Sequence, residues 1–349
     1  MADLKLLAQL SEAFGVPSEE QEIAKLLASE FKKIGYKTDI DRFGNVIARS
    51  PKAKNNPLMF GAHIDEIGLM VKFITDKGFL RFIKVGGIDN RVLPNQRVLI
   101  PTRDGKKIYG VIGHKPPHVE KKGADKHVPE AKDLFIDIGA KSRKEVEKLG
   151  IAIGTPVGFD ISMRTLENGR ITGKALDDRV GCYCMLQAAK ELKNKNVVFV
   201  GTAQEEVSTF GKGAALSAYH LEPHAFIAVD TAVAGDHPEI SEEDTGGVSL
   251  DKGPTITLVE ASAMGNVADR QLRSDVLAIA AKAKIKCQLE VIEGGATDAA
   301  SVYPVRGGIP SIAVNVPSRY IHSNVSICSI KDIEQTTKLV VALGQGLQP

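Results

Sequence analysis

The stretch Asn196–Glu206 reads NVVFVGTAQEE and joins a continuous apolar run to two adjacent carboxylates. A short apolar run bounded by polar residues is typical of a strand that is buried on both faces of a parallel sheet. In open α/β sheets, ligands bind beyond the carboxyl ends of the strands. The pattern therefore predicts that Glu205 and Glu206 lie at a functional edge, although a lone Glu-Glu pair is more often exposed in a loop.

Three more stretches repeat this pattern of an apolar strand followed by polar residues, and helical patterns separate them. The predicted strands are Leu58–His63, Ala225–Asp230 and Ser311–Val316, and the predicted helices between and after them are Val180–Leu192, Val267–Ala283 and Ile330–Leu343. Residues 3–34 also have apolar residues at helical spacing, with a break at Gly15–Ser18. Strands that alternate with helices predict an α/β fold, a mostly parallel sheet with helices on both faces.

The sequence changes character between residues 71 and 161, where short alternating stretches are separated by turn signals such as Asp76-Lys77-Gly78. This pattern predicts a small β-barrel inserted into the α/β domain, which then comprises residues 1–70 and 162–349. Within the insertion, Lys115–Ala131 is rich in Lys, His, Pro and Glu and has no periodicity. We expect a long mobile loop there, either solvated or ordered against a neighbouring subunit.

The composition excludes several classes of partner. The 349 residues include 45 basic and 43 acidic ones, so we expect neither nucleic-acid binding nor attachment to a membrane surface. No apolar stretch reaches the roughly 18 residues of a membrane span. The N-terminal segment carries charges throughout, unlike a signal peptide. The four cysteines, at positions 182, 184, 287 and 328, lack the spacing of a zinc site and predict free thiols in a reducing cytoplasm.

Histidines and carboxylates follow the predicted buried strands or precede a helix. The candidates are His63, Asp65, Asp177, Asp178, Glu205, Glu206, Asp230 and His322. If they converge at one edge of the sheet, the carboxylates repel one another unless positive charge is present. One or two divalent cations would supply it, and nitrogen with oxygen ligands suits zinc, cobalt or manganese in a catalytic site.

Two metal ions would need a bridging carboxylate, and Asp177 is the candidate. Asp230 and His63 would complete one metal position, and Glu206 and His322 would complete the other. Asp65 could accept the second imidazole N–H of His63 and fix its tautomer. Glu205 would then serve as the general base on a metal-bridging water, and the implied chemistry is metal-assisted hydrolysis.

Each of these residues has an ordinary interpretation when taken alone. A single buried histidine is more often structural, and Asp177-Asp178 could cap the helix that follows. A glycosidase pair at Glu205-Glu206 is disfavoured, because adjacent residues do not readily straddle a sugar across about 5–9 Å.

Five motifs together resemble the tetrahedral (TET) aminopeptidases of clan MH, a family that includes glutamyl and deblocking aminopeptidases. They are Gly61–Gly68, Lys174–Arg179, Ala203–Val207, Val229-Asp230 and Arg319–Ser323, and they occur in order over nearly the whole chain. The resemblance implies two metal ions held by His63, Asp177, Glu206, Asp230 and His322, with Glu205 as base and Asp65 orienting His63. It also implies a cis Asp177–Asp178 peptide, a dimerisation role for the barrel, and hollow homododecamers that admit short peptides.

Three departures from the family pattern lie near where a substrate side chain is expected. They are Val207–Ala214, Gly294–Asp298 and Asn324, which follows His322-Ser323 where the family has proline. The preferred N-terminal residue therefore stays open. The sequence therefore predicts an aminopeptidase that binds two divalent metal ions and acts on short peptides. The alternatives are a related amidohydrolase, such as a carboxypeptidase or an acyl-amino-acid deacylase, and a binding protein on an inactive peptidase fold.

Overall fold

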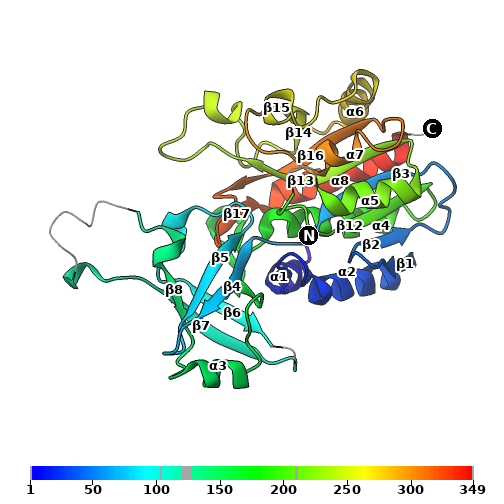
Figure 1. The fold of residues 1–349 in the computed structure, drawn as a ribbon. Helices are drawn as coiled ribbons and strands as arrows, with labels where there is room; N and C mark the ends of the chain where they lie inside the picture. The colour runs from blue at the N-terminus through cyan, green and yellow to red at the C-terminus, as the bar shows by residue number, and fades with distance from the viewer. Residues whose placement is uncertain (1, 103, 120–127, 209–210, 348–349) are drawn as a thin grey trace.

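The computed structural model describes residues 2–102, 104–119, 128–208 and 211–347 of the chain. It contains one mixed sheet flanked by helices and a separate closed β-barrel. In Figure 1 the barrel projects to the lower left of the α/β part of the molecule. The predicted combination of an α/β fold with an additional small barrel is confirmed.

The main sheet has the strand order β1-β2-β12-β3-β13-β16-β17-β11-β10, with β14 and β15 added beside β16. Its strands are β1 Lys37–Ile40, β2 Val46–Arg49, β3 Leu58–His63, β10 Arg164–Leu166, β11 Arg170–Gly173, β12 Val197–Thr202, β13 Ala225–Val233, β14 Thr255–Val259, β15 Gln288–Val291, β16 Ser311–Arg319 and β17 Ser326–Ser329. The central strands β12, β3, β13 and β16 pair in parallel, whereas the flanking pairs, apart from β14–β15, are antiparallel. The predicted parallel arrangement thus applies to the centre of the sheet.

Helices cover both faces of this sheet (Figure 1). They are α1 Leu4–Glu12, α2 Gln21–Ile34, α4 Leu176–Glu191, α5 Lys212–Leu221, α6 Arg270–Lys282, α7 Asp298–Val302 and α8 Ile330–Gly346. Because side chains alternate across a strand, Phe199 belongs to the apolar core on the face covered by α1, α2, α4, α6 and α8. Its neighbours Val198 and Val200 belong to the core on the face covered by α5 and α7. Both faces are therefore apolar, and only the strand ends are available for polar chemistry.

An aromatic cluster fixes the packing of α2 on the sheet. The ring of Phe199 stacks on Phe31 of α2 at 5.7 Å and on Phe60 of β3 at 5.3 Å. All three side chains are completely buried. Burial of such a side chain contributes roughly 1.5–3 kcal/mol, so the cluster stabilises β3, which ends at His63, and β12, which leads to Glu205 and Glu206.

The barrel has the strand order β4-β5-β8-β7-β6-β9. Its strands are β4 Gly68–Ile74, β5 Leu80–Val85, β6 Arg97–Pro101, β7 Lys107–Gly113, β8 Phe135–Asp137 and β9 Pro156–Phe159, and α3 Arg143–Lys148 lies between β8 and β9. They enclose a separate apolar core that includes Leu69, Val98 and Ile136. The barrel strands begin three residues before the predicted boundary at residue 71, since Gly68 already pairs with Val85.

The predicted mobile loop Lys115–Ala131 joins β7 to β8. Its residues 120–127 lie outside the described part of the chain, so this prediction is not tested. Short 3₁₀ turns occur at Pro117–Val119 and Ala131–Asp133. None of the helices in the described part of the chain has the length and apolar character needed to cross a bilayer.

A buried ionic cluster joins the N-terminal segment, the end of β3 and the start of α4. The ammonium Nζ of Lys174 lies 2.7 Å from Oε2 of Glu66, and the amide of Gly15 donates to Oε1 of the same carboxylate at 3.0 Å. The guanidinium of Arg179 donates to the carbonyl oxygens of Leu10 and Ala13. Because these charged groups are almost completely buried, each depends on its partners.

We expect Lys174→Met to lower the free energy of unfolding by about 3–5 kcal/mol, because it removes the nearer cation of the buried Glu66 carboxylate and leaves only Arg179 at 4.0 Å. Equilibrium denaturation in urea measures the effect. Lys190→Met is the matched control, since that ammonium contacts Gln187 on the exposed side of α4. Equal denaturation midpoints for Lys174→Met and the control would show that the buried pair does not stabilise the fold.

Candidate active site

His63 is the last residue of β3, and its side chain is 2 % exposed. Its Nδ1 lies 3.1 Å from the backbone carbonyl oxygen of Asp65 and 3.6 Å from the Asp65 carboxylate. In a neutral imidazole the carbonyl contact places the proton on Nδ1, because a carbonyl oxygen only accepts. The lone pair of Nε2 then faces Asp177 at 3.2 Å and Asp230 at 4.0 Å.

Asp177 lies between the two candidate histidines. Its Oδ1 is 3.2 Å from Nε2 of His63, and its Oδ2 is 3.5 Å from Nε2 of His322. His322 follows β16 on a turn where its own φ is +59°, and its side chain is 44 % exposed. The same Nε2 lies 3.5 Å from Oε2 of Glu206. One carboxylate therefore reaches two imidazoles that lie 259 residues apart in the sequence.

The Glu205-Glu206 pair is held by Asp65 through the backbone. Oδ1 of Asp65 accepts the amide N–H of Glu205, and Oδ2 accepts that of Glu206, both at 3.0 Å. The preceding Gln204 has a φ of +60°, which turns the chain sharply after β12. The Asp65 carboxylate is closer to these amides than to the His63 ring, so its direct hydrogen-bonding partner differs from the expected imidazole.

Asp178 has a structural position at the start of α4. Its Oδ2 accepts the amide N–H of His63 at 3.1 Å, and its Oδ1 accepts that of Gly181 at 3.0 Å. The side chain thus ties the end of β3 to α4 and places Asp177 beside His63. The Asp177–Asp178 peptide bond is cis, as the family resemblance implies.

All seven predicted site residues lie at the carboxyl end of the central strands. Asp230 of β13, His63 of β3 and the Glu205-Glu206 pair after β12 belong to neighbouring parallel strands. Asp177 and His322 approach them from α4 and from the turn after β16. A narrow cleft opens here, lined by Ile67, Ala175, Asp177, Glu206, His322, Ser323 and Ser326.

Burial dominates the electrostatics of the carboxylates. It raises the pKa of Glu206 well above its ordinary value, and the charge of Asp177 adds to this shift. Burial also raises the pKa of Asp230 and of Glu205, although the positive charge of His63 opposes both shifts. Without additional positive charge, these groups therefore resist ionisation.

Asp177 and His63 behave in the opposite way because they face each other. Burial alone would raise the pKa of Asp177, but the hydrogen bond and charge of His63 outweigh it and lower the value to about 2. Burial alone would lower the pKa of His63, but Asp177 and Asp65 raise it well above the ordinary value. The pair thus favours a charged carboxylate next to an imidazole that binds a cation or a proton.

The donor set fits divalent metal ions. Two groups of side chains have ligand atoms within 4.8 Å of one another, namely His63 with Asp177 and Glu206, and His63 with Asp178 and Asp230. Imidazole nitrogen with carboxylate oxygen suits zinc, cobalt or manganese, and cations would relieve the repulsion that raises the carboxylate pKa values. Both oxygens of Asp178 already accept backbone N–H groups, so Asp177 is the better bridging candidate.

Asp298, the first residue of α7, is a buried group near the site to which the sequence analysis gave no role. Its Oδ2 accepts the hydroxyl of Thr202 at the end of β12, and its Oδ1 has no hydrogen-bonding partner among the described residues. Burial raises the pKa of Asp298 to about 6. The signal in the sequence was the segment Gly294–Asp298, noted there only as a departure from a family pattern.

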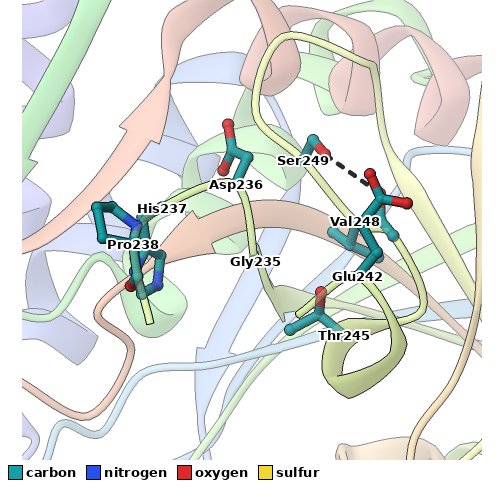
Figure 2. Close-up of a pocket in the computed structure, with 9 residues that line it drawn as sticks. Gly235, Asp236, His237, Pro238, Glu242, Thr245, Val248 and Ser249 are labelled. Atoms are coloured by element: carbon teal, nitrogen blue, oxygen red, sulfur yellow. Dashed lines mark hydrogen bonds between the residues drawn. The ribbon is translucent and has the colours of Figure 1, made fainter. Parts of the chain in front are cut away.

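A larger cavity of about 430 Å³ lies in the loop that follows β13 and contains none of the predicted site residues. Figure 2 shows His237 and Pro238 on one side of it and Val248 and Ser249 on the other. The ring of His237 lies 5.0 Å from that of Tyr320, two residues before His322. The cavity therefore borders the turn that carries His322, but the titratable cluster lies in the narrow cleft.

Comparisons with known proteins agree with this geometry. The model of the M42 glutamyl aminopeptidase family matches residues 44–339. A lysyl aminopeptidase of Pyrococcus furiosus is 32 % identical over 357 aligned positions, which cover 100 % of this chain and 99 % of the relative.

Two solved structures are similar over their whole length. An aminopeptidase from the archaeon Desulfurococcus kamchatkensis is 39 % identical with a TM-score of 0.92, covering 99 % of this chain and 95 % of that one. The Pyrococcus horikoshii TET1 peptidase, which can assemble into a tetrahedron or a large octahedral shell, is 34 % identical with a TM-score of 0.87, covering 98 % of each chain. With a family model that matches most of its length and a site of this kind, the chain belongs to the M42 glutamyl aminopeptidase family and is a peptidase.

Proposed function

We propose that the protein is a di-metal aminopeptidase that removes N-terminal residues from short peptides. The observation that carries this proposal is the position of Asp177, whose two oxygens face the Nε2 atoms of His63 and His322 at 3.2 and 3.5 Å. A carboxylate that presents one oxygen to each of two ligand sets is what a site for two metal ions requires.

One metal position would be formed by His63, Asp230 and Asp177, and the other by Glu206, His322 and Asp177. Zinc or cobalt fits this set best, and manganese is also compatible. When bound, such ions supply Lewis acidity, which polarises a peptide carbonyl and makes water more acidic. Strands β3 and β13 carry His63 and Asp230, the loop after β12 carries Glu206, and Asp177 and His322 come from the start of α4 and the turn after β16.

Glu205 is the proposed general base. It accepts a proton from the attacking water and passes it to the amine that leaves when the peptide bond breaks. Two features support this role: burial raises the pKa of its carboxyl group, and its amide is fixed by Asp65 at 3.0 Å. Asp65 acts as a positioning residue, since it also fixes Glu206 and contacts His63.

We further propose that the chain self-associates into a homododecamer built from dimers. The assembly of the related TET1 peptidase supports this, as do the barrel strands, which expose Phe73, Ile83, Tyr109 and Val111. The division into a catalytic domain, residues 1–70 and 162–349, and a dimerisation domain, residues 71–161, belongs to the same proposal. The four cysteines are free, which supports a location in the reducing cytoplasm.

A substrate panel tests the reaction class. We expect hydrolysis of aminoacyl amides and of short peptides with a free N-terminal amine, measured with zinc, cobalt or manganese added to chelator-treated enzyme. N-acetylated versions of the same peptides should be cleaved at least tenfold more slowly. Preference for the blocked peptides would instead indicate a deacylase, and preference for C-terminal residues a carboxypeptidase.

Replacing the proposed base separates catalysis from metal binding. Glu205→Gln should lower kcat by about 10²- to 10⁴-fold while metal content stays unchanged, because the amide is nearly isosteric but cannot accept the proton. The control is Glu191→Gln on the exposed end of α4. An active Glu205→Gln enzyme with full metal content would exclude Glu205 as the base.

Metal removal should destabilise the protein, and more so at pH 8 than at pH 6. The raised pKa values of Glu206 and Asp230 mean that the folded protein keeps protons that the unfolded chain releases above about pH 4, so unfolding becomes easier as pH rises. The raised pKa of His63 acts in the same direction, whereas Asp177, with a value of about 2, changes charge only in acid.

Thermal unfolding with and without a chelator measures this dependence. The difference in Tm between the metal-loaded and metal-free protein should grow from pH 6 to pH 8, since protons and cations compete for the same groups. A difference in Tm that is zero, or that shrinks as pH rises, would contradict the proposed ligand cluster.

A further inference from the structure

The barrel reaches the candidate active site through one turn. Strand β5 ends at Val85, and Gly86 and Gly87 lead into the 3₁₀ turn Asn90–Val92. The ammonium of Lys84 braces this connection by donating to the carbonyl of Ile88 at 2.6 Å and to Oδ1 of Asn90 at 2.9 Å. These two hydrogen bonds therefore fix the turn to strand β5 of the barrel.

The backbone of this turn lies directly against two proposed metal ligands. A β-carbon added to Gly87 would be 2.9 Å from Nδ1 and 3.3 Å from Cε1 of His322. Among the described residues, these two atoms would be its nearest contacts apart from its chain neighbours. A β-carbon on Gly86 would be 3.4 Å from Oε2 of Glu206 and 2.8 Å from Cγ2 of Ile67. Only glycine lets the chain approach the His322 ring this closely.

A second contact ties the His322 turn to the barrel. Nδ2 of Asn324 donates to Oε1 of Gln96 at 2.6 Å, and Asn324 is 3 % exposed. Within the turn, the hydroxyl of Ser323 donates to the carbonyl of Tyr320 at 2.6 Å. The His322 ring thus lies against the Gly87 backbone, and Asn324 ties the turn that carries it to Gln96, so both supports come from the barrel.

The two proposed metal positions differ in this respect. His63 and Asp230 sit on adjacent central strands, and their described contacts come from the α/β domain. The other position depends on His322, which has a half-exposed side chain on a turn with positive φ. A ligand on such a turn needs outside support if it is to keep its Nε2 aimed at Asp177 and Glu206.

We propose that the Gly86–Gly87 turn of the barrel, together with Gln96, is a positioning element for His322, so that the barrel completes one of the two metal positions. This inference rests on the proposed di-metal function. The barrel would then contribute to the site of its own chain, in addition to any role in contacts between chains.

Gly87→Ala tests the proposal, with Gly307→Ala as the matched control. Neither glycine has a positive φ, so alanine introduces no backbone strain, but a β-carbon at Gly307 meets no atom within 4 Å. Equilibrium dialysis followed by elemental analysis should find two ions in the wild type and the control. In Gly87→Ala, one ion should bind about 10- to 100-fold more weakly, as expected for loss of a supporting contact.

A double-mutant cycle with His322→Ala shows whether Gly87 acts through the ring. If it does, Gly87→Ala should cause no further loss of metal affinity once the imidazole is absent. Gln96→Ala adds no bulk to the turn, and it should lower the affinity for the same ion by a smaller factor. Size-exclusion chromatography and Tm report whether assembly and folding are unchanged.

The outcomes separate the two proposals. A wild-type protein without two bound ions overturns the di-metal function itself. A wild type with two ions, and a Gly87→Ala variant that binds both with unchanged affinity or loses both equally, overturns the positioning role alone. An effect of Gly87→Ala that persists in the His322→Ala background overturns it as well.

Discussion

The repulsion between carboxylates gathered at one end of the sheet is the constraint on which this structure depends. Parallel central strands bring their polar ends together, and several of those ends are acidic. Three of these carboxylates have hydrogen-bonding or ionic partners within the protein, although burial still raises the pKa of Asp178 well above its ordinary value. Asp65 and Asp178 accept backbone amides, and Glu66 pairs with Lys174.

The remaining carboxylates have less internal compensation. Asp177 gains from His63, but the pKa values of Glu205, Glu206 and Asp230 stay raised even in the presence of that imidazole. The division has a physical meaning, because a residue saturated by amides cannot readily change partner, whereas an undercompensated one gains free energy from a bound cation. Carboxylates with internal partners therefore stabilise the fold, and carboxylates with few partners are available to bind a cation.

The sequence predicts the centre of the fold well, because the signals there are local. The apolar runs Leu58–His63 and Val197–Val200 become β3 and β12, and the alternating segment becomes the barrel. The short strands β10, β11 and β17 have no such signal, and β11 is stabilised by pairing with β17, which lies far along the chain. For the same reason, β16 continues to Arg319, beyond the predicted end at Val316.

In the candidate site, too, the sequence predicts some features and not others. Strand-end placement and family resemblance identify His63, Asp177 and His322, and the structure brings them together. The hydrogen bonds of Asp65 to the amides of Glu205 and Glu206, and the contact of Gly87 with His322, depend on positions of backbone atoms. No pattern of side chains encodes such contacts, so sequence reasoning alone could not find them.

The anchoring of Arg179 has a consequence for how the N-terminal helix can change over evolution. Its guanidinium binds the backbone carbonyls of Leu10 and Ala13, groups that every amino acid possesses. Substitutions at these two positions therefore leave the acceptors in place, provided that the new side chains still fit the core. An insertion or deletion near the end of α1 would move the acceptors themselves, so this region should tolerate drift in composition but not in length.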